Sequence, residues 1–129
     1  MEIIKLRPHH ATEIKQRLEC KTDPEDFAEL LNRLHYDTQT ILIVLNILQK
    51  VRNPMQLIEI LPDEDLANDP ICQNCVTKRK ISRCDKPLLP GRIGKDGFEG
   101  LRFGLRQGEQ FTVEQLMKKK EAFGPHFRI

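Results

Sequence analysis

Tryptophan is absent from this chain of 129 residues, and no apolar run approaches the length of a membrane span. The longest apolar block, Ile41 to Leu48, is interrupted by Asn46, whereas a transmembrane helix needs about 20 apolar residues. The first ten residues lack the basic segment and the apolar stretch that mark a secretory signal. We therefore expect a cytoplasmic protein without membrane contact, folded as one domain over residues 1–129.

The chain also has little net charge, only +2, but that charge is unevenly spread. Residues 1–75 carry 8 Lys/Arg against 13 Asp/Glu, whereas residues 76–129 carry 13 against 6. A basic C-terminal half can contact an acidic protein or nucleic acid, for instance through Lys78–Lys80. No aromatic residue is interleaved with that basic run, which argues against a surface that stacks bases. A solvated basic face is the simpler alternative.

Short strands and amphipathic helices account for most of the sequence. We expect a strand at Glu2–Leu6, a helix at Pro8–Glu19, a helix that Asp23 caps and Pro24 begins, and a strand at Gln56–Ile60. Between these last two elements we expect a buried helix ending near Val51, with Ile41, Leu45, Leu48 and Val51 on one face. Towards the C-terminus we expect one or two helical turns within Phe98–Leu105, a turn over Arg106–Phe111, and a last helix at whose start Thr112 and Gln115 have the spacing of a capping box. Between the second strand and Gly97 the sequence is polar and rich in Gly and Pro, which predicts an irregular segment.

The fold class that follows is α+β and mainly helical. It comprises about four to five helices, one short pairing of two strands, and a long cysteine-bearing loop over about residues 62–97. A loop of this length in a small domain is usually functional or ordered by a cross-link, and a bound metal would provide such a cross-link.

Three cysteines lie inside this loop, and a fourth lies far from it. Cys72 and Cys75 are separated by two residues, the spacing at which two sulfurs of one turn converge on a metal. Cys84 follows after eight more residues and is a third candidate ligand. In a reducing compartment, closely spaced cysteines of this kind are more often metal or redox groups than disulfides.

The remaining ligand is open between Cys20 and a histidine. Cys20 would complete a four-cysteine site, although an isolated cysteine is commonly a small apolar core residue. His9 and His10 are the competing nitrogen donors, and adjacent helical residues point about 100° apart, so we expect at most one of them to face a given metal. The alternative is that His9 and His10 do not bind metal and are polar residues with ordinary hydrogen bonds at the start of a helix.

The sequence lacks the signatures that would specify the metal or a reaction. It has neither the second Cys-x-x-Cys of a zinc ribbon nor the Cys-x-x-Cys-x-x-Cys run of bacterial ferredoxins. Zinc and an iron–sulfur cluster are therefore both candidates for the bound group. No phosphate-binding loop or nucleophile motif is present. Glu13, one turn after the histidines, is the only base that a metal-dependent hydrolase would have here.

Two short motifs, one near the N-terminus and one around the paired cysteines, occur together in this chain. Arg7, Pro8, His9 and His10 form an RPHH motif, and Asp69 precedes the paired cysteines in D-x-x-C-x-x-C, with Cys84 further on. This combination resembles a small prokaryotic family of single-domain proteins of unknown function to which iron–sulfur binding is ascribed. The family places a cysteine three residues after the second histidine, where this chain has Glu13. Either Cys20 or a histidine then supplies the ligand that the family's cysteine would provide, or the site has three thiolates and an open coordination position.

We therefore interpret the chain as a small metal-binding protein. The first hypothesis is an iron–sulfur cluster held by Cys72, Cys75 and Cys84, with Cys20 or a nitrogen of His9 or His10 completing the set, and with the reaction and any enzymatic activity left open. The alternative is a zinc-stabilised interaction module that docks an acidic protein partner or nucleic acid through its basic C-terminal half.

Overall fold

The computed structural model describes residues 2–72 and 94–122 and has the predicted α+β, mainly helical architecture. The elements in chain order are β1 (Ile4–Leu6), α1 (Pro8–Glu19), α2 (Pro24–Arg33), α3 (Thr38–Lys50), β2 (Leu57–Ile60), α5 (Lys95–Phe103), β3 (Gln110–Thr112) and α6 (Val113–Lys118). None of the described helices is long and apolar enough to cross a membrane.

A small sheet with β2 at its centre organises the fold. β1 pairs with β2 in parallel, with Leu6 opposite Ile60, and β3 pairs with β2 antiparallel, with Phe111 opposite Ile58. The prediction of a two-stranded pairing missed the third strand, whose residues were expected to form the turn before the last helix. β3 has three residues, of which only Phe111 is buried, so it shows no alternation of its own. Its strand conformation depends on its partner.

Local signals in the sequence explain where the helices begin and end. Asp23 accepts a hydrogen bond from the Glu25 N–H at 3.0 Å, and Pro24 occupies the first turn of α2. Thr112 and Gln115 form the predicted capping box at the start of α6. Gly104 ends α5 in a left-handed conformation with φ of 65°, which glycine adopts without steric cost.

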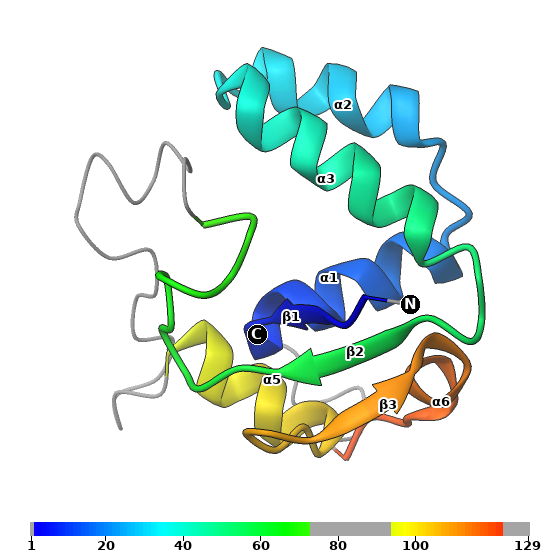
Figure 1. The fold of residues 1–129 in the computed structure, drawn as a ribbon, viewed down its shortest axis with the longest axis vertical. Coiled ribbons are helices and arrows are strands. Elements are labelled where there is room, and N and C mark those ends of the chain that lie inside the picture. The colour runs from blue at the N-terminus through cyan, green and yellow to red at the C-terminus, as the bar shows by residue number, and fades with distance from the viewer. Residues whose placement is uncertain (1, 73–93, 123–129) are drawn as a thin grey trace.

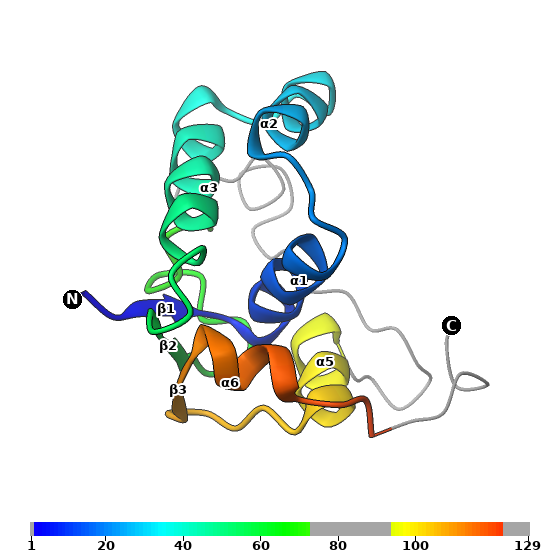
Figure 2. The ribbon, with the colours of Figure 1, turned by 90° about the vertical axis from the view of Figure 1, so that its right-hand side faces the viewer.

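The helices divide into two groups (Figures 1 and 2). α1, α5 and α6 lie beside the sheet, while α2 and α3 form a hairpin that extends away from it (Figure 2). One hydrophobic core joins the groups. Its buried members come from both: Ile4, Leu6, Ala11, Ile14, Leu31, Val44, Ile47, Leu48, Val51, Ile58, Ile60, Leu105, Phe111, Val113 and Leu116.

The irregular segment predicted for about residues 62–97 is shorter at its end than expected. Residues 61–72 contain turns and no helix or strand, in agreement with the prediction, but α5 already begins at Lys95. Asp96 lies in the first turn of that helix, and its fully buried carboxylate makes contacts that glycine and proline content could not reveal. Cys75, Cys84 and Lys78–Lys80 lie outside the described residues.

Candidate metal centre

The site begins where β1 passes into α1. Arg7 follows the last residue of the strand in an extended conformation, with φ of −64° and ψ of 153°, and Pro8 then starts the helix. A residue before proline is biased towards this extended geometry, so the sequence itself sets the junction. The junction places the Arg7 side chain and the imidazole of His10 at the same end of α1.

A tight turn from Asp69 to Cys72 approaches this junction from the other side. The Asp69 carboxylate accepts from the Ile71 N–H at 2.8 Å, and the Asp69 carbonyl accepts from the Cys72 N–H at 3.1 Å. Aspartate commonly folds the following backbone in this way. The second oxygen of the Asp69 carboxylate accepts from the Arg7 N–H at 2.8 Å, which anchors the turn to α1. Asp69 and Cys72 are both almost completely buried.

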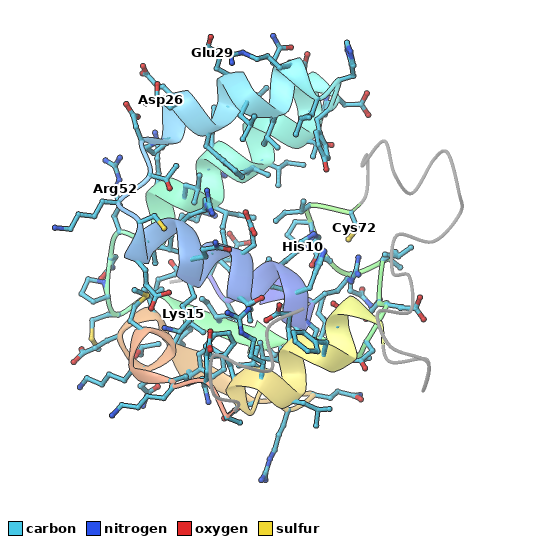
Figure 3. All side chains as sticks on the ribbon, turned by 180° about the vertical axis from the view of Figure 1, so that it is seen from behind. His10, Lys15, Asp26, Glu29, Arg52 and Cys72 are labelled. Atoms are coloured by element: carbon cyan, nitrogen blue, oxygen red, sulfur yellow. The ribbon has the colours of Figure 1, made fainter. Side chains whose placement is uncertain are left out.

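The turn and the helix together bring three different donor atoms into one group. His10 Nδ1 lies 2.8 Å from Asp69 Oδ2 and 3.9 Å from Cys72 Sγ. The ligand atoms of the three residues all lie within 4.8 Å of one another. Figure 3 shows His10 at the end of α1 close to Cys72, which lies on the turn. A zinc–sulfur bond of about 2.3 Å and a zinc–nitrogen bond of about 2.0 Å place ligand atoms roughly 3–4 Å apart. The group could therefore hold one metal ion if His10 and Asp69 moved slightly apart.

A buried ion pair lies directly beside this group. Arg7 Nε donates to Asp96 Oδ2 at 2.8 Å, and both side chains are fully buried. Arg7 Nη1 donates to Cys72 Sγ at 3.1 Å. Asp96 also accepts the backbone N–H of His9 at 3.1 Å and that of Glu64 at 2.6 Å. Through Arg7 and Asp96, α5 is fixed against the first turn of α1 and against the segment after β2.

The electrostatics of the group favour an ionised carboxylate. Burial by itself raises the pKa of Asp69, but the hydrogen bond and charge of His10, together with the N–H groups of Arg7 and Ile71, outweigh it. The pKa of Asp69 is therefore lowered from its ordinary value. An ionised carboxylate can act as a ligand to a cation.

A cavity of about 1550 Å³ borders the group on the side of His10. Its lining includes His10, Ile71, Thr40 and Val44, so α1, α3 and the turn before Cys72 all contribute. The His10 side chain is 13% exposed, whereas Asp69 has no exposed side-chain surface. Of the three residues, His10 is the one that lines this cavity.

The structure brings together two of the predicted site residues, His10 and Cys72. His9 contacts the His10 ring, with centroids 4.2 Å apart, but it is outside the three-residue group. Cys20 is exposed at the C-terminal end of α1, about 15 Å along the helix axis from His10. Ligation by Cys20, like ligation by Cys75 and Cys84, stays a prediction. Glu13 is half-exposed and pairs with Arg17 at 3.4 Å.

Sequence reasoning did not identify Asp69, Arg7 and Asp96 as parts of the site. Asp69 stands three residues before Cys72, and a carboxylate at that spacing can both shape the turn and face the same centre. Arg7 belongs to the RPHH motif, but its partner Asp96 lies 89 residues away. No local pattern reports a pair of that separation.

Comparison with family models, with curated proteins and with solved structures gives no match for this chain.

Proposed function

We propose that this chain is a metal-binding protein whose centre is built at His10, Asp69 and Cys72. The observation that carries the proposal is the convergence of an imidazole nitrogen, a carboxylate oxygen and a sulfur from two segments 59 to 62 residues apart. Imidazole and thiolate are the donors that zinc and iron share in proteins. All three side chains are buried or nearly so, as expected of a preformed centre.

An iron–sulfur cluster is the first candidate for the bound group. Cys72, Cys75 and Cys84 would supply three thiolates, and the nitrogen of His10 would supply the ligand that the cysteine pattern leaves open. Histidine replaces cysteine at some iron–sulfur centres and raises their reduction potential. Support for His10 in this role is its distance of 3.9 Å from Cys72 Sγ. The cluster would supply one-electron chemistry.

A single zinc ion is the second candidate, and the position of Asp69 favours it. A carboxylate is an ordinary zinc ligand and is unusual at a cluster, and Asp69 lies within hydrogen-bond distance of the imidazole nitrogen, at 2.8 Å. With zinc, the centre would stabilise the fold, and the basic C-terminal half would remain available for an acidic protein partner or nucleic acid.

The experiment that tests the proposal is metal and sulfide analysis of protein purified without oxygen, with its absorption spectrum. Iron and sulfide in stoichiometric amounts with broad visible absorption support the cluster. One zinc in a colourless protein supports the second candidate. Protein that holds neither metal, and that takes up neither iron with sulfide nor zinc, contradicts the proposal.

Two cysteine variants locate the centre. Cys72→Ser should lose the metal, because a hydroxyl is a poor substitute for thiolate with either metal. Cys20→Ser is the matched comparison, since Cys20 is exposed at the opposite end of α1. Full metal content in Cys20→Ser removes Cys20 from the predicted ligands, and loss of metal in that variant would place it among them. His10→Ala should also lose the metal, as Cys72→Ser does.

A further inference from the structure

Arg7 makes contact with two of the three residues of the candidate metal centre. Its backbone N–H donates to Asp69 Oδ2 at 2.8 Å, and its guanidinium Nη1 donates to Cys72 Sγ at 3.1 Å. Through Nε the same guanidinium donates to Asp96 at 2.8 Å. One residue thus connects a carboxylate ligand, a sulfur ligand and a buried carboxylate that is not part of the group.

Burial of the Arg7–Asp96 ion pair carries a large desolvation cost. Both side chains are fully buried, and the cost of taking two charges out of water can exceed the gain from their attraction. Apolar side chains of similar volume would fill the same space without that cost. Stability alone therefore does not account for this pair, whereas the direction that it gives to the guanidinium does.

Asp96 holds the guanidinium in one orientation. Its carboxylate is itself fixed by the backbone N–H groups of His9 and Glu64, so it offers Arg7 a rigid acceptor. The guanidinium is planar and carries its donors in a fixed fork, so the bond from Nε to Asp96 sets where Nη1 points. Nη1 then lies 3.1 Å from Cys72 Sγ.

We propose that Arg7 is a positioning residue of the metal centre, which orients the sulfur of Cys72 and limits how much electron density that sulfur gives to a bound metal. The inference rests on the proposed function, because it concerns the same centre. A hydrogen bond from a cation draws electron density from sulfur, and contacts of this kind outside the ligand shell tune both metal affinity and reduction potential.

Cobalt(II) is the probe that tests Arg7, since it occupies zinc sites and its sulfur-to-cobalt charge-transfer band reports on the sulfur. The metal-free protein is titrated with Co²⁺, and the affinity and the band position are recorded for wild type and Arg7→Met. We expect affinity to fall about 10–100-fold because the sulfur is no longer held in place, as for other residues outside the ligand shell. We expect the band to move to longer wavelength because the sulfur becomes more electron-rich.

Three further variants separate positioning from general stability. Arg102→Met is the matched control, since Arg102 pairs with Glu99 and Glu121 and contacts none of the three candidate ligands; its band should equal that of wild type. Asp96→Asn should shift the band in the same direction as Arg7→Met, because the amide removes the negative charge that holds the guanidinium and leaves a single oxygen for the donors of Arg7, His9 and Glu64. Arg7→Lys keeps the charge but not the fork, and it provides a folded comparison if Arg7→Met does not fold.

The outcomes are distinct. A wild-type band and affinity in every folded Arg7 and Asp96 variant overturns the role of Arg7 and leaves the proposed function intact. Failure of the wild type to bind Co²⁺, zinc or iron overturns the proposed function and this inference with it.

Discussion

His10 Nδ1 and Asp69 Oδ2 lie 2.8 Å apart, although 59 residues separate them in the chain. The same Asp69 oxygen accepts the Arg7 N–H, and the other oxygen accepts the Ile71 N–H. One buried carboxylate therefore joins the first turn of α1 to the turn that carries Cys72. The consequences of this junction are open to measurement without any metal.

Asp69→Asn should lower the free energy of unfolding of the metal-free protein by about 2–4 kcal/mol. The amide has one oxygen acceptor, so one of the buried donors around it is left unpaired. Urea denaturation with a chelator present measures the loss. Asp65→Asn is the control, because Asp65 accepts from Asn68 in the same segment but is only partly buried, and its hydrogen bonds are exposed to solvent. Equal effects of the two substitutions would contradict a special role for Asp69.

The acid dependence of stability should also change in Asp69→Asn. The pKa of Asp69 is lower in the folded state than in the unfolded state. Its contribution to stability is therefore complete above the unfolded pKa, about 3.9, and is lost as pH falls through the folded pKa. The substituted protein should lose less stability than wild type on acidification. Parallel curves for the two proteins in acid would show that this carboxyl does not carry the effect.

Glu99 should produce the opposite dependence. Burial raises the pKa of Glu99, and the charge of Arg102 reverses this only in part. The folded state then holds the Glu99 proton more tightly, so the free energy of unfolding falls as pH rises from the ordinary value of 4.5 through the raised folded pKa. Glu99→Gln should remove that fall, as seen in urea midpoints across this range. Glu114→Gln, at an exposed pair with Lys118, should leave it in place.

Thr40→Val should stabilise the protein by about 1 kcal/mol. Thr40 is 1% exposed, and within the described part of the chain its hydroxyl has no hydrogen-bond partner. A buried hydroxyl without a partner costs free energy that a methyl group does not. Thr38→Val, at an exposed position two residues earlier in α3, is the control. A loss of stability in Thr40→Val would indicate that the hydroxyl is bonded in solution.

Much of the fold could be predicted because its signals are local. Pro8 and the Asp23–Pro24 pair mark the starts of α1 and α2, and the capping box at Thr112 marks α6. β3 was missed because three residues with one buried side chain have no visible period. In α3 the predicted face is confirmed at the buried Leu48 and Val51, whereas Ile41 and Leu45 are only partly buried and Val44 and Ile47 are buried as well. The position of neighbouring elements decides which side of an apolar helix is covered.

The residues of the candidate site also divide into those with a local sequence signal and those that only long-range contacts bring together. Cys72 and His10 were predicted because sulfur and imidazole in closely spaced motifs are recognisable from residue type alone. Asp69, Arg7 and Asp96 are charged residues of kinds that usually lie on the surface, and only the tertiary structure buries them together. Their roles depend on contacts across 62 to 89 residues, which no window of sequence contains.

The parallel pairing of β1 with β2 has a consequence for folding kinetics. Three helices, α1 to α3, must cross between the two strands before Leu6 can pair with Ile60. His10 and Cys72 therefore meet only after a long chain closure, whose entropy cost is met late in folding. If an ion binds only after this closure, its bonds to the two residues are absent from the transition state. Such bonds slow unfolding and leave the folding rate almost unchanged.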